Sequence, residues 1–347
     1  MKKLRVAVIG AGWVSLHRHV PAIRSHPDAE LVGIMDRKPG RASQAAKDHR
    51  ILRFAEVSRA SDAPWFNEVD AVAIATAPFT HAALAMECLR AGKHVITEKP
   101  FAMNTEEGQA MLTCAKESGK TLAVVHNFQF STAFARAHAD LKTGQLGELM
   151  AVEATQFSNP NRRLPEWFQQ LPGGLFYDES PHLLYLMKVL GGGSFELTTA
   201  YANRDSAGSQ TPAQLTAFLV GGNKCPLRLS VSFVAPLSEW QIFICGSKRL
   251  AVIDIFRDVY ISLPNDGEHV TSTVLRTSAL ATLQHWFGSI RPGLSHVLGK
   301  ALYGNDELYS RFVRSCLSGK PPQDISAEDG YSVLEMQHRI LQACNWT

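Results

Sequence analysis

Short apolar runs alternate with helix-like stretches along the first 125 residues. The apolar runs have the length and β-branched content of strands buried on both faces, and they cover residues 4–9, 30–35, 70–75, 94–97 and 121–125. Stretches with helical periodicity lie between them, over residues 14–25, 39–49, 80–91 and 105–118. This alternation predicts repeated βαβ units and a doubly wound parallel sheet.

The pattern changes after residue 125. Apolar and polar positions alternate over residues 229–233 and 240–242, which is typical of an antiparallel sheet with one covered face. Helices are expected at 132–142, directly after His182, at 306–317 and at 327–344. Ser326, with Asp329 three positions later, predicts a capping-box start for the last of these. Because 347 residues exceed one usual core, we expect two domains, at 1–125 and 126–347.

The composition is that of an ordinary globular enzyme, with 19% charged and 45% hydrophobic residues. The formal net charge of +3 is spread along the chain, so we expect no nucleic-acid or membrane partner. The six cysteines are widely spaced, without the clustered Cys, His or carboxylate residues of a metal site, and no metal is predicted. With neither a signal peptide nor a run of 18 apolar residues, the sequence predicts a cytoplasmic protein.

A glycine-rich turn, Gly10-Ala11-Gly12, lies where the first strand should pass into a helix. Two glycines allow a tight turn close to a pyrophosphate, which the positive end of the helix favours, although Ser15 replaces the third glycine of the usual pattern. Asp36 ends the second strand, where a carboxylate can bind ribose hydroxyls; the alternative is a surface carboxylate at a strand end. Arg37 is a possible 2′-phosphate partner, but Asp36 would repel that group, so NAD is favoured over NADP.

Two further groups of residues are candidates for the chemistry. Glu98-Lys99-Pro100 ends a predicted parallel strand, at the edge where open α/β sheets bind ligands; the alternative is a solvated loop lysine. Asp178 and His182 are four positions apart, and either Asp178 or Ser180 is a plausible N-cap of the helix that follows. One helical turn apart, Asp178 and His182 can share a cleft as an acid–base pair, or be a cap and a structural histidine.

Jointly, these motifs resemble the glucose-fructose oxidoreductase and inositol dehydrogenase (Gfo/Idh/MocA) family. The resemblance also rests on Thr76-Ala77-Pro78, His81 and Gly92-Lys93-His94-Val95, and it extends over nearly the whole chain. It implies an N-terminal Rossmann domain, a C-terminal α/β domain with a large, mainly antiparallel open sheet, and NAD(P)-dependent chemistry on a sugar, cyclitol or sugar derivative. It also implies a homo-dimer or homo-tetramer that forms through the C-terminal sheet.

The resemblance assigns roles to particular residues. The predicted catalytic residues are Lys99, Asp178 and His182. The predicted cofactor-binding residues are Gly10, Gly12, Trp13, Val14, Asp36, Arg37, Thr76, Pro78, His81, Glu98 and Lys99. Residues considered for the substrate side are His126, Arg162, Arg163, Trp167 and Tyr185. Tyr185 stands where many relatives have an aspartate, so hydrogen bonding to the substrate should differ from that of inositol dehydrogenase.

These roles lead to a hypothesis for the reaction. His182 removes the proton of a substrate hydroxyl while hydride leaves the same substrate carbon for nicotinamide. Asp178 orients the imidazole or a substrate hydroxyl, and Lys99 stabilises the developing alkoxide. Two other functions stay open at the level of sequence. One is an NAD-dependent glycosidase, in which transient oxidation assists bond cleavage, and the other is a dinucleotide-binding regulator without turnover. The presence of Lys99, Asp178 and His182 together argues against the regulator.

Overall fold

The computed structural model describes residues 3–204, 209–299 and 301–346, and the chain divides into two compact units. The first unit contains the residues through Asn127 together with Gly304–Glu335, and the second contains Phe128–Tyr303 and the residues from Met336 onward. The sequence-based division at residue 125 assigned everything beyond it to the second domain. The structure differs in that a late segment, Gly304–Glu335, returns to pack with the first unit.

The first unit is built on a six-stranded sheet whose paired strands are all parallel, in the order β3-β2-β1-β4-β5-β6. Its strands are β1 (Leu4–Ile9), β2 (Ala29–Asp36), β3 (Phe54–Glu56), β4 (Ala71–Ile74), β5 (His94–Thr97) and β6 (Leu122–Val124). The buried faces of β1 and β4 confirm strands covered on both sides. The short strand β3 was not predicted, since two of its three residues are exposed.

Helices of the first unit follow the strands as predicted. They are α1 (Val20–Ser25), α2 (Arg41–Asp48), α3 (His81–Arg90), α4 (Thr105–Ser118) and α8 (Asn305–Ser318), with short η2 (Ala60–Asp62), η3 (Phe66–Glu68) and η4 (Pro78–Thr80). The helix expected over 14–25 instead starts as a π-helical segment, η1 (Ser15–His19). Ser326 and Asp329 exchange hydrogen bonds of 3.2, 2.9 and 3.1 Å at the start of α9 (Ala327–Ala343), which confirms the capping box.

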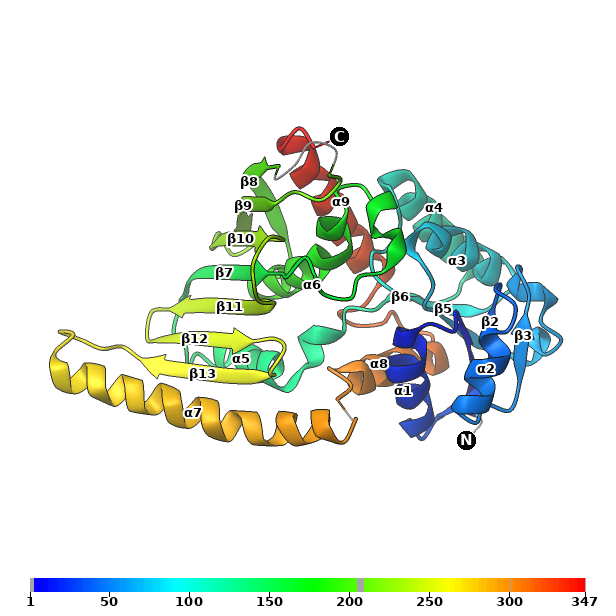
Figure 1. The fold of residues 1–347 in the computed structure, drawn as a ribbon, viewed down its shortest axis with the longest axis horizontal. Helices are drawn as coiled ribbons and strands as arrows, with labels where there is room; N and C mark the ends of the chain where they lie inside the picture. Colours follow the sequence, from blue (N-terminus) through cyan, green and yellow to red (C-terminus); the bar gives the residue numbers. More distant parts are fainter. Residues whose placement is uncertain (1–2, 205–208, 300, 347) are drawn as a thin grey trace. The chain divides into compact units, whose positions relative to one another are not determined.

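The second unit is built on a seven-stranded sheet in the order β13-β12-β11-β7-β10-β9-β8 (Figure 1). The pairing of β7 with β10 is parallel and the other pairings are antiparallel, so the prediction of a mainly antiparallel sheet is confirmed. Its strands are β7 (Leu149–Phe157), β8 (Phe195–Asn203), β9 (Gln214–Gly221), β10 (Pro226–Ser232), β11 (Glu239–Gly246), β12 (Arg249–Asp254) and β13 (Val259–Pro264).

Helices α5 (Thr132–Lys142) and α6 (Leu175–Leu190) pack against this sheet, α5 on β12 and β13 and α6 on β7 and β10. Two short segments, η5 (Asn127–Phe130) and η6 (Glu166–Gln170), precede them in turn. A long helix, α7 (Thr271–Val297), lies along β13 and was not predicted (Figure 1). Within residues 3–204, 209–299 and 301–346, no helix combines the length and apolarity needed to cross a membrane.

Candidate functional site

The glycine turn after β1 has the geometry of a phosphate cradle. Gly10 has a φ of +100°, and a Cβ there would lie 2.4 Å from the carbonyl oxygen of Ala75, so only glycine fits. At Gly12, by contrast, a Cβ would meet nothing within 4 Å, which leaves open space beside the backbone. Ser15, in place of the third glycine, is fully buried, with its hydroxyl 3.5 Å from the Ala75 carbonyl. The turn therefore has room for a group that approaches the backbone at Gly12.

Asp36 lies at the carboxyl end of β2, and its carboxylate is tied to the glycine turn. One oxygen accepts a 2.9 Å hydrogen bond from the Ala11 amide, and the other accepts one of 2.9 Å from the Lys38 amide. The Arg41 guanidinium is 3.9 Å from the first oxygen. Because each carboxylate oxygen has two lone pairs, acceptor capacity remains for ribose hydroxyls. The residues present therefore fit a dinucleotide.

Other predicted cofactor residues lie near this edge of the first unit. Trp13 is half exposed, and its ring stacks on His17 at 4.7 Å, with the Arg18 guanidinium 4.8 Å from the ring centre. Val14 is also exposed and Arg37 is on the surface. Further predicted residues, Thr76 and Pro78, follow β4, where the hydroxyls of Thr76 and Thr80 are 2.7 Å apart.

His81 is fully buried at the start of α3. Its Nδ1 is 2.8 Å from the Pro100 carbonyl oxygen and its Nε2 is 3.2 Å from that of Thr76. Burial lowers the pKa of His81, so the ring is neutral and supplies one N–H, which we assign to the shorter contact with Pro100. We therefore interpret His81 as support for the Lys99–Pro100 peptide bond, which is cis, while its contact with the cofactor stays a prediction.

Glu98 is held by a chain of buried side chains that the sequence analysis missed. His19, in η1, has its Nε2 3.0 Å from Glu98 and its Nδ1 2.7 Å from the Tyr309 hydroxyl of α8. A carboxylate can only accept, so Nε2–H donates to Glu98 and Nδ1 accepts the Tyr309 proton. Burial, and then the charge of Glu98, raise the pKa of Tyr309 well above its ordinary value, which keeps this hydroxyl a donor.

The negative charge of Glu98 sits next to Lys99. Burial favours a higher pKa for Glu98, but the hydrogen bond from His19, with a smaller contribution from the charge of Lys99, outweighs it, so the pKa is lowered. The second oxygen of Glu98 accepts a 3.1 Å hydrogen bond from the Lys99 amide. Glu98 thus stays ionised and fixes the backbone that presents Lys99 at the carboxyl end of β5.

In the second unit, Asp178 and His182 both belong to α6, but that helix starts earlier than predicted. Its N-cap is Gly174, so the prediction that Asp178 or Ser180 caps the helix was wrong. The helix predicted after His182 is present, and it extends to Leu190. Gly174 has a φ of +54°, and a Cβ there would lie 2.1 Å from the Thr211 hydroxyl, so this entry requires glycine. Asp178 lies in the first turn, and His182 follows one turn later on the same side of the helix.

Pro181 lies inside α6, where it removes the N–H that would bond the Tyr177 carbonyl. Gln337, buried in the second half of α9, donates a 2.8 Å hydrogen bond to that carbonyl and a 3.0 Å bond to the Ser180 hydroxyl. The side chain of Gln337 therefore replaces the missing backbone donor. It also anchors α6 between the two candidate catalytic residues, a role that sequence analysis did not identify.

His182 is surrounded by aromatic rings. Its Nδ1 is 2.9 Å from the Tyr185 hydroxyl, and the oxygen of that hydroxyl accepts a 3.0 Å hydrogen bond from the Phe128 amide. The ring centres of Phe128, Tyr185 and Trp240 lie 4.7, 5.7 and 5.8 Å from that of His182. Tyr185 is buried, and its hydroxyl lies within hydrogen-bond distance of the imidazole, while its role toward a substrate stays a prediction.

The remaining residues predicted for the substrate side lie in different surroundings, and their roles stay predictions. Arg162 forms an ion pair with Glu179, whose carboxylate also accepts hydrogen bonds from Gln156 and Ser158. This guanidinium is thus engaged in fixing its loop to α6. Arg163 is exposed, Trp167 is half-buried in η6 and His126 is buried after β6.

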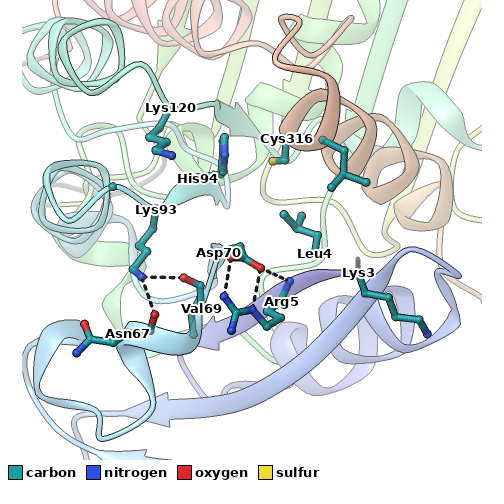
Figure 2. A pocket seen from close by; sticks show the side chains of 12 residues that line it. Lys3, Leu4, Arg5, Asn67, Val69, Asp70, Lys93, His94, Lys120 and Cys316 are labelled. Atoms are coloured by element: carbon teal, nitrogen blue, oxygen red, sulfur yellow. Dashed lines mark hydrogen bonds and ion pairs between the residues drawn. The ribbon is translucent and has the colours of Figure 1, made fainter. Parts of the chain in front are cut away.

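A cavity of about 340 Å³ lies at the opposite, amino-terminal edge of the parallel sheet (Figure 2). Basic side chains line it, but Arg5 is paired with Asp70 through contacts of 3.0 and 2.9 Å, and the Lys93 ammonium donates to the Val69 carbonyl at 2.7 Å. The cavity thus lies at the start of β5, whereas Lys99 follows the end of that strand. No group of three or more potential metal ligands occurs among the described residues.

A parallel sheet with a glycine turn, a carboxylate after β2 and a lysine after β5 defines a dinucleotide-binding oxidoreductase. Comparison with known proteins confirms this class. Residues 4–126 match the model of an oxidoreductase family with an NAD-binding Rossmann fold, and residues 134–252 match its C-terminal domain. The chain belongs to the Gfo/Idh/MocA family, and it is an oxidoreductase with an NAD-binding Rossmann domain.

Individual relatives are distant. An uncharacterized oxidoreductase, YdgJ, from Escherichia coli K12 is 26% identical over 96% of this chain and 94% of its own length. The scyllo-inositol 2-dehydrogenase (NAD(+)) of Bacillus subtilis strain 168 is 29% identical, over 52% of each chain. The WlbA dehydrogenase from Bordetella pertussis, solved with NADH and UDP-GlcNAcA, aligns with a TM-score of 0.77 and 22% identity over 99% of this chain and 96% of that one. That likeness shows the fold.

Proposed function

We propose that this protein transfers hydride between nicotinamide and a hydroxyl or keto carbon of a sugar, cyclitol or sugar derivative. The observation that carries the proposal is the lysine at the carboxyl end of β5, in a family whose named relatives include scyllo-inositol 2-dehydrogenase. Relatives that act on nucleotide-linked sugars, such as the dTDP-sugar 3-reductase of Streptomyces violaceoruber, also support a sugar substrate.

In the proposed reaction, His182 Nε2 accepts the proton of the substrate hydroxyl as the same carbon loses hydride and becomes a carbonyl. When bound, the nicotinamide supplies the hydride acceptor, or the donor in the reverse direction. For Nε2 to accept a proton, the hydrogen of the neutral imidazole must be on Nδ1, and the Tyr185 hydroxyl oxygen is the acceptor that holds it there. Asp178, one turn before His182, orients the imidazole or a neighbouring substrate hydroxyl.

Lys99 is proposed to stabilise the alkoxide that develops as the proton leaves. Its amide is fixed by Glu98, which His19 and Tyr309 hold in turn. The ionised Glu98 beside it favours the charged ammonium of Lys99. A cation placed where negative charge develops lowers the barrier more than it stabilises the neutral alcohol.

We propose NAD as the preferred cofactor, with NADP the weaker one. The support is Asp36, whose carboxylate is already anchored by two amides and would face an added 2′-phosphate with like charge. Competition between NADH and NADPH, followed by nicotinamide fluorescence, tests this preference. Tighter binding of NADPH would contradict it.

We further propose that the protein works in the cytoplasm, where its six free cysteines stay reduced, and forms a homo-dimer or homo-tetramer through the C-terminal sheet. The uncovered face of that sheet exposes large side chains, among them Phe157, Tyr201 and Phe218. Phe218→Glu should therefore lower the mass of the assembly in solution. An unchanged mass would count against this interface.

The activity is tested by a nicotinamide-absorbance screen over free sugars, cyclitols and nucleotide sugars. With a substrate that turns over, Lys99→Met and His182→Asn should each lose at least about 100-fold in kcat. Lys116→Met and His285→Asn, at exposed positions on α4 and α7, are matched controls and should keep the wild-type rate. Full turnover by either site variant would contradict the assignment, and release of an aglycone without net NADH would indicate the glycosidase instead.

A further inference from the structure

Helix α7 differs from an ordinary surface helix in that its large apolar side chains do not face the sheet on which it packs. Not one of its 27 residues is buried. The face toward β13 carries small or polar residues: a Cβ on Gly288 would lie 3.3 Å from Val259, and Gln284 bonds to Ser262. The outer face carries Trp286 and Phe287, which are 72% and 70% exposed. A surface helix normally directs its large apolar side chains to the core. In α7 these side chains are exposed, so the outer face lacks a partner within the described part of the chain.

The attachment of α7 to the sheet explains why its inner face is polar. Among the residues that the structure describes, β13 is an edge strand, so no strand there pairs with its outward N–H and C=O groups. The Gln284 side chain accepts from the Ser262 amide at 2.8 Å and donates to the Ser262 carbonyl at 3.1 Å, as a paired strand would. The inner face of α7 thus protects the sheet edge, and its apolar residues are left for another contact.

The spacing of the outer residues indicates what kind of partner fits. Large apolar side chains recur at alternating steps of three and four, at the partly exposed Leu280 and at the exposed Leu283, Phe287, Ile290, Leu294 and Val297. This is the 3.5-residue repeat of a seam between two packed helices, over about two and a half heptads. Such a seam fits an α-helix as its partner better than it fits a flat surface.

We propose that the outer face of α7 packs against α7 of a second copy of this chain, in an antiparallel arrangement around a two-fold axis. With the axis between Phe287 and Ile290, each apolar residue faces an apolar residue of the other copy. The layers pair Phe287 with Ile290, Leu283 with Leu294, and Leu280 with Val297. One self-complementary patch is all that a two-fold interface requires, and antiparallel helix dipoles attract each other.

The exposed area is sufficient for such a contact. Weighted by their exposed fractions, Trp286 and the seam residues from Leu283 to Val297 leave on the order of 800 Å² accessible per copy. A stable interface buries about 800 Å² on each partner. Helix α7 has two arginines, Arg276 and Arg291, and no acidic residue, so neither copy brings a run of like charge to the seam.

A membrane surface fits less well. Interfacial helices pair an apolar face with a strongly basic face directed to water and lipid headgroups. In α7 the face that carries Gln284 and Gly288 is occupied by the β13 edge, and two arginines are the only formal charges of the helix. The interface proposed here is also separate from the uncovered sheet face, because it uses α7 at the β13 edge.

The first test is the mass of the full-length protein in solution, by light scattering or sedimentation. Ile290→Glu, at an exposed position in the seam, should lower the mass twofold, whereas Thr282→Glu, exposed but outside the seam, should leave it unchanged. Circular dichroism verifies that both variants fold. A monomeric wild type, or a wild-type mass for a folded Ile290→Glu protein, would overturn the proposal, as would binding of the monomer to phosphatidylglycerol vesicles through α7.

A second test reports the orientation even if Ile290→Glu fails to fold. In a Cys245→Ser background, which removes the exposed native thiol, one chain carries Leu283→Cys and another carries Leu294→Cys. The antiparallel seam predicts disulfide-linked dimers in the mixture and not in either variant alone, since identical positions would be roughly 16 Å apart along the axis. Cross-linking of each variant with itself, or none in the mixture, would refute the antiparallel contact.

Discussion

Replacing Tyr185 with phenylalanine removes one oxygen atom and tests how His182 is held. That oxygen lies 2.9 Å from His182 Nδ1 and accepts from the Phe128 amide at 3.0 Å, and Tyr185 is only 2% exposed. In the proposed reaction the imidazole becomes positively charged when it takes the substrate proton. Its hydrogen bond to Tyr185 is then charge-assisted, and such bonds contribute about 1.5–3 kcal/mol.

This hydrogen-bond free energy sets the expected change in kcat. Loss of about 1.5–3 kcal/mol in the transition state corresponds to a roughly 10- to 150-fold decrease in kcat, with little change in the KM of the sugar. The same substitution leaves the Phe128 amide without its acceptor, which should lower the free energy of unfolding by about 1–3 kcal/mol. Stopped-flow nicotinamide absorbance measures the first effect and denaturant unfolding measures the second.

Tyr260→Phe is the matched control, because its hydroxyl donates to Asp140 at 2.8 Å in the same unit but does not contact His182. It should lose stability and keep kcat. If Tyr185→Phe loses stability but turns over at the wild-type rate, then Tyr185 is a structural residue and the proposed positioning of His182 is wrong.

Other substitutions test the first unit. Gly12→Ala should leave the thermal midpoint within about 2 °C of wild type but weaken NADH binding more than 10-fold. Gly10→Ala, whose Cβ would meet the Ala75 carbonyl, should instead destabilise the fold itself. Equal losses of stability in the two variants would contradict the proposed phosphate cradle. The pKa of Glu98 is lowered, so its charge stabilises the fold above the ordinary carboxyl pKa and this contribution is lost as pH falls. Glu98→Gln should therefore cost about 1–3 kcal/mol in unfolding free energy near neutral pH. The difference from wild type should begin to shrink as pH falls past the ordinary carboxyl pKa of about 4.3, and it should vanish only below the lowered pKa of Glu98 in the folded protein. A difference that does not depend on pH would exclude the ionised Glu98.

The first unit was the more predictable part of the fold. The strands Leu4–Ile9 and His94–Thr97 and the helix Thr105–Ser118 have the predicted bounds, because strands buried on both faces and a helix with the Asn104 cap carry strong local signals. The return of Gly304–Glu335 to this unit was not predictable from local pattern. It depends on tertiary contacts such as the bond between His19 and Tyr309, which are 290 positions apart.

The two errors in the second unit have local causes. The N-cap was predicted at Asp178 or Ser180, whereas Gly174 caps α6 and Gln337 supplies the donor that Pro181 lacks inside the helix. Gly288 and Pro292 likewise concealed α7, whose N-cap, Val270, makes no side-chain hydrogen bond. Sequence analysis found the candidate catalytic residues but not their supports, since His19, Tyr309 and Gln337 are identified by their partners in space.

The most direct test of the proposed hydride transfer uses a substrate from the sugar and cyclitol screen that carries deuterium on the reacting carbon. After oxidation by the wild-type protein, the reduced nicotinamide is isolated and its deuterium content is measured by mass spectrometry. The proposal predicts one deuterium at nicotinamide C4 for each carbonyl formed, and a rate at least about 100-fold lower for His182→Asn. Carbonyl product with no deuterium in the cofactor would contradict the proposed reaction.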